Sequence, residues 1–227
     1  MIKAQKICKT YQSPAGLLPV LRDLDFEVGA SESASIVGPS GSGKTTLLNL
    51  LGALDRPSSG SIEVDGKVVS ELDEKAAAHF RNRSIGFIFQ LHYLLPQCSV
   101  LDNVLVPRLT GAWEEPATET RQRAENLLGE VGLQDRMEYR PYQLSGGEQL
   151  RVAIARSLIN QPKIILADEP TGSLDPATGE RIAELLIRSN RGRNVALVVV
   201  THNLGLAGRM QKSYQLEDGR LIPRERS

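Results

Sequence analysis

The sequence contains little cysteine and no excess of charge of either sign. Its two cysteines, Cys8 and Cys98, lie far apart among 227 residues, which argues against a disulfide framework and fits a reducing cytosol. The 27 basic and 27 acidic residues cancel. The chain therefore lacks the broad positive field that non-specific nucleic-acid binding needs, and we expect no nucleic-acid partner.

A candidate membrane span is also missing. The longest apolar run, Val195 to Val200, has six residues, whereas a membrane span needs about 18 or more. No signal-peptide pattern follows Met1. We expect a cytoplasmic protein, or one that its partners hold peripherally on the cytoplasmic side of the inner membrane.

Two kinds of pattern predict the fold, and the length allows one large α/β domain. Apolar residues alternate at Leu24, Phe26 and Val28, which predicts a strand, and the pairs Asp65-Gly66 and Asp218-Gly219 predict hairpin turns. Four apolar runs interleaved with helical segments are typical of a mostly parallel sheet covered on both faces. These runs are residues 33–37, 85–89, 164–167 and 195–200.

The middle of the chain has no comparable strand pattern. Residues 117–131 and 148–159 have helical patterns, and prolines punctuate the loops between Gln90 and Pro162. We therefore predict a single domain, 1–227. Its core, with an antiparallel β subdomain, comprises residues 1–89 and 163–227, and residues 90–162 form an inserted α-helical subdomain.

The segment GPSGSGKTT carries the strongest functional pattern. Residues 38–45 fit G-x-x-x-x-G-K-[ST], directly after a buried strand and directly before an apolar helix. In this context, backbone N–H groups close around phosphates, Lys44 reaches the outer phosphates and Thr45 offers a hydroxyl to Mg²⁺. The alternative is a glycine-rich loop without a ligand. The candidate nucleotide-binding residues here are Gly38, Pro39, Ser40, Gly41, Ser42, Gly43, Lys44, Thr45 and Thr46.

Polar residues follow several of the predicted strands. Asp168 and Glu169 end an apolar strand, where Asp168 can hold Mg²⁺ and Glu169 can orient or deprotonate a water; the alternative is a solvated acidic pair. Gln90 and His202 each follow a strand, but taken singly both are weak signals. Tyr11 could stack on a base or serve ordinary packing. The residues Leu144 to Gln149, LSGGEQ, are a second, weaker candidate for a phosphate-binding helix start.

In order along the chain, the segments GPSGSGKTT, FIFQ, LSGGEQ, ILADEP, GSLD and VVTHN resemble those of the ATP-binding subunit of ABC transporters. The resemblance covers essentially the whole chain and implies the ABC ATPase fold, a P-loop NTPase (RecA-like) core, with ATP and Mg²⁺ as cofactors. It also explains the second phosphate site. In that family the LSGGE segment contacts the γ-phosphate of ATP bound to the other copy, so the resemblance implies a head-to-tail homodimer that hydrolyses ATP.

The resemblance also assigns roles to residues. Lys44 and Thr45 bind phosphate and Mg²⁺, Gln90 touches metal and water, and Asp168 supports Mg²⁺. Glu169 is the catalytic base, and His202 contacts the γ-phosphate. By the same resemblance, Tyr11 stacks on adenine, and residues 173–175 link the two sites across the dimer. The segment that acts in trans contains Ser145, Gly146 and Gly147. Two positions depart from the family pattern, Asn203 in place of an aspartate and Leu150 in place of a polar residue; neither handles phosphate.

Finer segments, LLNLLGALDRPSSG, RNRSIGFIFQ and ADEPTGSLD, resemble the subgroup that includes lipoprotein-releasing and macrolide-exporting ATPases. That subgroup pairs with integral membrane permease subunits, and we expect these to dock near residues 91–98. Because Leu94 and Leu95 lie in this segment, it could instead pack as local core. The functional alternatives are a cell-division regulator and an ABC ATPase that transports nothing.

Overall fold

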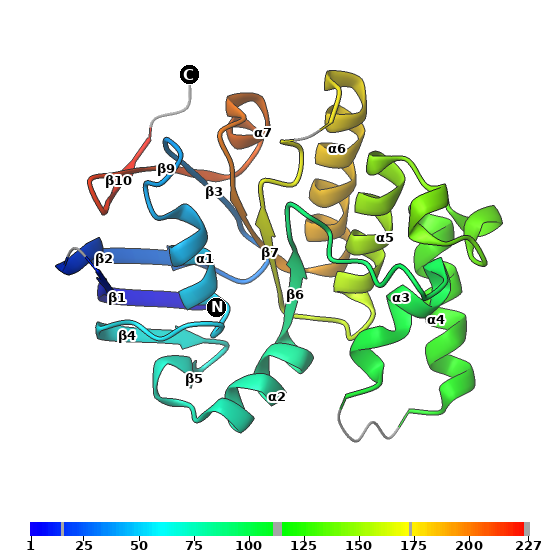
Figure 1. The fold of residues 1–227 in the computed structure, drawn as a ribbon, viewed down its shortest axis with the longest axis horizontal. Coiled ribbons are helices and arrows are strands. Elements are labelled where there is room, and N and C mark those ends of the chain that lie inside the picture. Colours follow the sequence, from blue (N-terminus) through cyan, green and yellow to red (C-terminus); the bar gives the residue numbers. More distant parts are fainter. Residues whose placement is uncertain (15, 111–114, 173, 225–227) are drawn as a thin grey trace.

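The computed structural model describes residues 1–14, 16–110, 115–172 and 174–224, which form two sheets and the helices around them (Figure 1). The first sheet is antiparallel, in the order β2-β1-β4-β5. Its strands are β1 (Ile2–Ser13), β2 (Gly16–Val28), β4 (Ser59–Val64) and β5 (Lys67–Val68). The second sheet has the order β10-β9-β3-β8-β7-β6. Its strands are β3 (Ser33–Val37), β6 (Ile85–Ile88), β7 (Ile164–Asp168), β8 (Ala196–Val200), β9 (Lys212–Glu217) and β10 (Arg220–Pro223).

The predicted mostly parallel sheet is confirmed. Strands β6, β7, β8, β3 and β9 run parallel to their neighbours, and only the pair β9–β10 is antiparallel. Every residue of β3, β7 and β8 is buried, as expected of strands with both faces covered. Because parallel strands end at the same edge, the residues after β3, β6, β7 and β8 meet at one edge of the sheet.

Seven α-helices are found in the described ranges. They are α1 (Lys44–Leu51), α2 (Glu74–Ser84), α3 (Val100–Leu105), α4 (Ala117–Glu130), α5 (Gly146–Leu158), α6 (Pro176–Arg193) and α7 (Leu204–Gly208). The helices predicted over residues 117–131 and 148–159 are confirmed as α4 and α5. α5 begins two residues earlier than its apolar pattern predicts, because Ser145 caps it.

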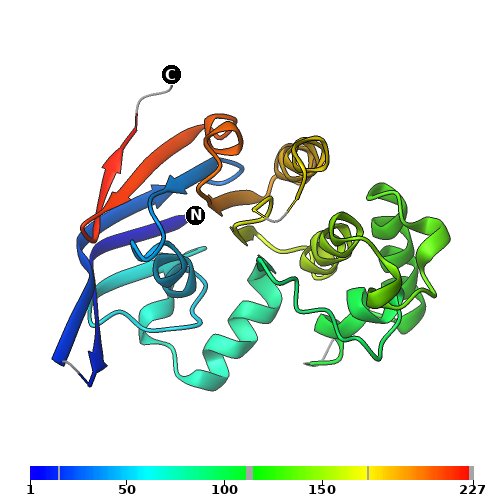
Figure 2. The same cartoon turned by 45° about the horizontal axis from the view of Figure 1, so that its top comes forward.

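The six-stranded sheet has a different hydrophobic cluster on each face. Ile164, Leu166 and Val198 face α1 and the antiparallel sheet, whereas the alternate residues Ile165 and Val199 face the other way. On that second face they pack with the helices α3, α4, α5 and α6. Figures 1 and 2 accordingly place α5 and α6 well away from α1.

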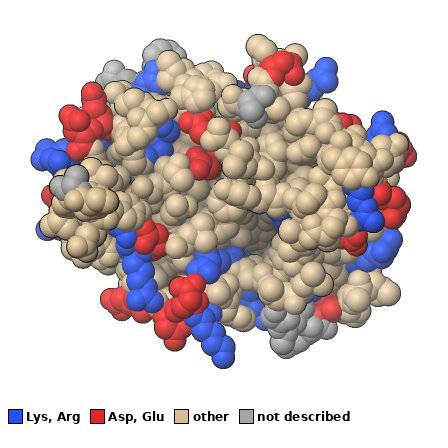
Figure 3. Space-filling model, in the orientation of Figure 1, with Lys and Arg blue, Asp and Glu red and all other residues tan. Residues whose placement is uncertain are grey.

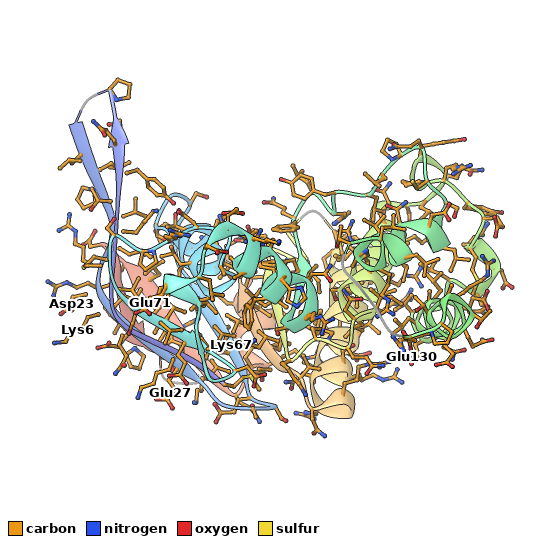
Figure 4. The ribbon with its side chains drawn as sticks, turned by 90° about the horizontal axis from the view of Figure 1, so that it is seen from below. Lys6, Asp23, Glu27, Lys67, Glu71 and Glu130 are labelled. Atoms are coloured by element: carbon orange, nitrogen blue, oxygen red, sulfur yellow. The ribbon has the colours of Figure 1, made fainter. Side chains whose placement is uncertain are left out.

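The antiparallel sheet is amphipathic. Ile7 and Leu24 belong to the buried cluster, whereas Lys6, Asp23 and Glu27 lie on the outer surface of the sheet (Figure 4). The predicted hairpin turns are confirmed as the connections β4–β5 and β9–β10. Their Asp-Gly pairs have positive φ at both positions, the conformation that suits a two-residue hairpin turn.

The predicted division of the chain at residues 90 and 162 stays a prediction. The helices of this segment share one hydrophobic cluster with core strands, which includes Leu127 and Leu150 together with Ile165. Within the described ranges, no helix is long and apolar enough to cross a membrane.

Candidate functional site

The loop between β3 and α1 has the backbone of a phosphate site. Gly41 and Gly43 have φ of 79° and 101°, in the region that favours glycine. A Cβ on Gly38 would lie 2.5 Å from the carbonyl oxygen of Leu216, so no larger residue fits there without displacing the loop. Gly43 caps α1 without a side-chain hydrogen bond, which leaves the first helical N–H groups open to an anion.

Two side chains of this loop have hydrogen-bonding capacity that a phosphate would use. Ser42 Oγ is buried and has no hydrogen-bond partner among the described residues, and such groups are rare in folded proteins. The Lys44 side chain is buried, and its Nζ donates to the carbonyl oxygens of Gly38 at 2.8 Å and Pro39 at 3.0 Å. The ammonium therefore lies where phosphate oxygens could replace these carbonyls. Pro39, Ser40 and Gly41 are exposed at the tip of the loop.

Thr45 and Asp168 provide oxygen ligands for a cation beside the phosphate loop. Thr45 Oγ1 donates to Asp168 Oδ2 at 3.1 Å, so the hydroxyl at the start of α1 meets the carboxylate at the end of β7. Burial raises the pKa of Asp168 above its ordinary value, Glu169 acts in the same direction, and the Thr45 hydrogen bond opposes them. Among the described residues, no cluster of three or more His, Cys, Asp or Glu side chains could hold a metal ion. The hydroxyl of Thr45 and the carboxylate of Asp168 are oxygen ligands of the kind that suits Mg²⁺, which takes one or two protein oxygens together with substrate phosphates.

Glu169 is held at the same edge of the sheet by groups that follow β8. Its Oε2 accepts hydrogen bonds from Thr201 Oγ1 at 3.0 Å and from the backbone N–H of His202 at 3.1 Å, and it lies 3.0 Å from His202 Nδ1. Glu169 also has a positive φ of 45°. Among the described residues, no group donates to its second oxygen, Oε1. One oxygen is thus fixed in place, and the other is left to accept a proton.

Two further predicted residues, Gln90 and Tyr11, lie on or after strands next to the phosphate and cation site. Gln90 is exposed and follows β6, whose Ile88 pairs with Ala167 of β7, so Gln90 begins its loop next to Asp168. Tyr11 lies on β1, beside Thr46 of α1.

The predicted trans-acting residues lie at the start of α5; they are Ser145, Gly146 and Gly147. Ser145 is the N-cap of α5, and a Cβ on Gly147 would lie 2.6 Å from Thr178 Cγ2 of α6. The body of α5 packs on the face of the sheet opposite to α1, and among the described residues no hydrogen bond joins Ser145 to Lys44. Ser173 of the predicted linking segment lies outside the described residues.

Several contributing residues were not predicted from the sequence. Thr201, which orients Glu169, follows the same strand as His202, and its place in VVVTHN is a signal that could have been used. Arg156 of α5 donates to the carbonyl oxygens of His92 and Tyr93. These two consecutive residues after Gln90 both have positive φ. Asn203, the departure noted above, accepts from the N–H of Leu206 and caps α7, as an aspartate would.

The parallel sheet, the glycine loop at the start of α1 and the acidic pair after β7 together define a P-loop nucleoside triphosphatase. The family model of the ABC transporter matches residues 21–172, and the chain belongs to this family. It is an ATP-binding, ATP-hydrolysing subunit of the ABC type.

Similar proteins cover the full chain. It is 48% identical over 226 residues to the lipoprotein-releasing system ATP-binding protein LolD 1 of Rhodopirellula baltica, which covers 100% of this chain and 98% of that protein. It is 47% identical to LolD of Syntrophus aciditrophicus, over 98% of this chain and 99% of that protein. Among solved structures, the ATP-binding cassette MJ0796, a dimer in a post-hydrolysis state bound to ADP and Pi, superimposes with a TM-score of 0.92 at 37% identity. That match covers 100% of this chain and 99% of the other.

Proposed function

We propose that this chain is the ATPase that powers a lipoprotein-releasing transporter. The observation that carries the proposal is the 48% identity to a lipoprotein-releasing ATPase along the whole chain. The matched region covers the whole chain and therefore contains the segments whose pattern is typical of this subgroup. The peripheral position of the chain on the cytoplasmic side of the inner membrane is part of the same proposal.

In the proposed reaction, the residues at the carboxyl edge of the sheet divide the work. Lys44, Ser42 and the first N–H groups of α1 bind the phosphates, and Thr45, Asp168 and Gln90 would hold Mg²⁺. The bound Mg²⁺ would neutralise charge that develops on the phosphates. Glu169, fixed through Oε2 by Thr201 and His202, accepts a proton from the attacking water at Oε1, and His202 contacts the γ-phosphate.

A second copy of the chain completes each site in this proposal. The body of α5, which Ser145 caps, packs on the face of the sheet opposite to α1, and in this proposal Ser145 and Gly147 contact the nucleotide of another copy. The dimeric state of the similar cassette bound to ADP and Pi supports this arrangement. Each dimer would contain two ATP sites.

The membrane partner docks, in our proposal, at a groove beside residues 91–98. This groove has a volume of about 620 Å³ and is lined largely by apolar groups, among them Phe87, Phe89, Tyr93 and Val106. In Figure 3 the charged side chains lie mainly around the edge of the face shown, and its centre is largely free of them. Leu94 packs against the hydrophobic cluster, whereas Leu91 and Tyr93 are 72% and 61% exposed. The segment therefore serves both as local core and as an exposed apolar surface for a partner.

The test is to deplete the chain in its own cell and to restore it with wild type or with variants. We expect depletion to leave acylated lipoproteins in the cytoplasmic membrane fraction. Wild type should restore their release and should co-purify from membranes with an integral protein. Tyr93→Glu should bind ATP but neither restore release nor recover the partner, whereas Glu27→Ala, on the outer surface of the antiparallel sheet, serves as the matched control.

Normal lipoprotein distribution after depletion would contradict lipoprotein release. Association with ribosomes or DNA would favour an ABC ATPase outside transport.

A further inference from the structure

The hydroxyl group of Tyr11 is held by an acidic residue that no sequence motif assigns to the site. Tyr11 is 37% exposed on β1, and its hydroxyl donates to Asp55 Oδ2 at 2.7 Å. Asp55 lies in the connection between α1 and β4, 44 residues further along the chain. Thr46, on the first turn of α1, lies beside the same hydroxyl. The ring is therefore next to the helix whose N-terminus forms the phosphate site.

The second oxygen of Asp55 is fixed as well. Oδ1 accepts from Lys9 Nζ at 2.7 Å and from the backbone N–H of Arg56 at 2.7 Å. Lys9 is buried, and its Nζ also donates to the carbonyl oxygen of Arg56 at 2.7 Å. The carboxylate thus has no rotational freedom to release Tyr11 without breaking charge-assisted hydrogen bonds.

Lys9 also contacts the ring itself. Its Nζ lies 4.7 Å from the centroid of the Tyr11 ring, which is within the range of a cation–π interaction. The ammonium lies over one face of the ring, and the Tyr11 side chain stays partly exposed to a ligand.

The electrostatics keep Tyr11 and Asp55 in the required protonation states. Burial opposes ionisation of Asp55, but the hydrogen bonds from Lys9, Tyr11 and the N–H of Arg56 outweigh it and hold its pKa below the ordinary value. Burial, followed by the hydrogen bond to Asp55, raises the pKa of Tyr11. At neutral pH Tyr11 is therefore a neutral donor and Asp55 an ionised acceptor.

From this geometry we propose that Asp55, anchored by Lys9, is a positioning residue that fixes the Tyr11 ring for stacking on the nucleotide base. An exposed tyrosine loses side-chain rotational entropy when a ligand immobilises it, and a ring held beforehand avoids that cost. The inference rests on the proposed function, in which Tyr11 stacks on adenine. It assigns to Asp55 a part of the affinity for the base and none of the affinity for the phosphates.

The test compares two probes on the full chain, ATP and inorganic tripolyphosphate, which has no base. Tyr11→Phe removes only the hydroxyl, and Asp55→Ala removes the acceptor. Each should weaken ATP binding about three- to tenfold, the effect of losing one hydrogen bond, and leave tripolyphosphate binding unchanged. In the double variant the loss should equal that of either single variant, because both remove the same interaction. Glu27→Ala, which removes an exposed carboxylate from the same sheet, should bind both probes as wild type does.

The results distinguish failure of the role of Asp55 from failure of the role of Tyr11. If Asp55→Ala weakens both probes equally, its role is structural and the inference is wrong. If Tyr11→Phe binds ATP as tightly as wild type, the hydroxyl does not position the ring, and the inference fails while the proposed function stands. If wild type binds ATP no more tightly than tripolyphosphate, there is no base site, and the proposed role of Tyr11 fails with the inference.

Discussion

Glu169 combines an unusual backbone with a carboxylate that is held on one side only. Its positive φ is costly for a residue other than glycine, by about 1–3 kcal/mol. Three groups of Thr201 and His202 surround Oε2. This arrangement aims a single oxygen, Oε1, away from those groups, as a general base requires.

For this single residue we predict that Glu169→Gln abolishes most ATP turnover without abolishing ATP binding. Glutamine has nearly the same size and can still accept from Thr201, but it cannot take a proton from water. We expect a loss of at least about a hundredfold in turnover, the lower end of the range for removal of a general base. Phosphate release measures the turnover, and binding of a fluorescent ATP analogue provides the control. Near-normal turnover would show that another group accepts the proton.

Among the elements, α5 begins at the segment that we propose acts in trans and joins it to the rest of the molecule. Its first turn has a capping box, in which Ser145 Oγ accepts from the N–H of Glu148 and Glu148 Oε2 accepts from the N–H and the hydroxyl of Ser145. Further along the helix, Arg156 binds the loop that follows Gln90. One helix therefore connects the exposed Ser145 with the loop that we propose as the docking segment.

The capping box leads to a prediction about stability and its pH dependence. Ser145→Ala should lower the free energy of unfolding by about 0.5–2 kcal/mol, the cost of losing an N-cap. The N–H and hydroxyl of Ser145 hold the pKa of Glu148 below its ordinary value. Glu148 therefore stabilises the fold above the unfolded-state pKa of about 4.3, and this contribution is lost as the pH falls through the lower folded-state value. Urea unfolding between pH 7 and 3 should thus show a difference between wild type and Glu148→Gln that is steady well above the unfolded-state pKa of about 4.3 and shrinks as the pH falls below it. A difference that does not depend on pH would contradict the ionised cap.

For the whole molecule, the two faces of the six-stranded sheet carry different helices. One face carries α1 and the phosphate loop, and the other carries the helices that include α5. Among the described residues of one chain, no hydrogen bond links Ser145 with Lys44.

For the association of whole chains, we predict that ATP with Mg²⁺ converts the isolated chain from monomer to dimer. The Glu169→Gln variant, which hydrolyses ATP slowly, should sediment as a dimer with ATP and as a monomer with ADP, which lacks the γ-phosphate between the copies. Adding Ser145→Arg should block the dimer while ATP binding to the single chain persists. Ser99→Ala is the matched control, because Ser99 forms the same capping box on α3 and is not part of the segment that acts in trans. Equal dimerisation with and without Ser145→Arg would rule out the trans contact.

The features that depend on neighbouring residues could be predicted from the sequence alone. The glycines that allow positive φ at Gly41 and Gly43, and the Asp-Gly hairpins, were predictable because backbone conformation is decided within a few residues. The apolar runs of β3, β7 and β8 were predictable because complete burial requires a continuous apolar stretch. The order of the polar residues after these strands already indicated a phosphate and cation site.

Contacts between residues that are distant in the sequence could not be predicted in this way. The bonds of Thr201 to Glu169 and of Asp55 to Tyr11 span 32 and 44 residues, and nothing in the local pattern of either partner marks the other. The packing of α1 and α5 on opposite faces follows from the alternation of side chains between the two faces of the sheet, which has meaning only once the strand order and the covering helices are known. Local sequence selects backbone conformations because steric effects act over a few bonds, whereas packing of the whole chain determines which side chains approach each other across the sheet.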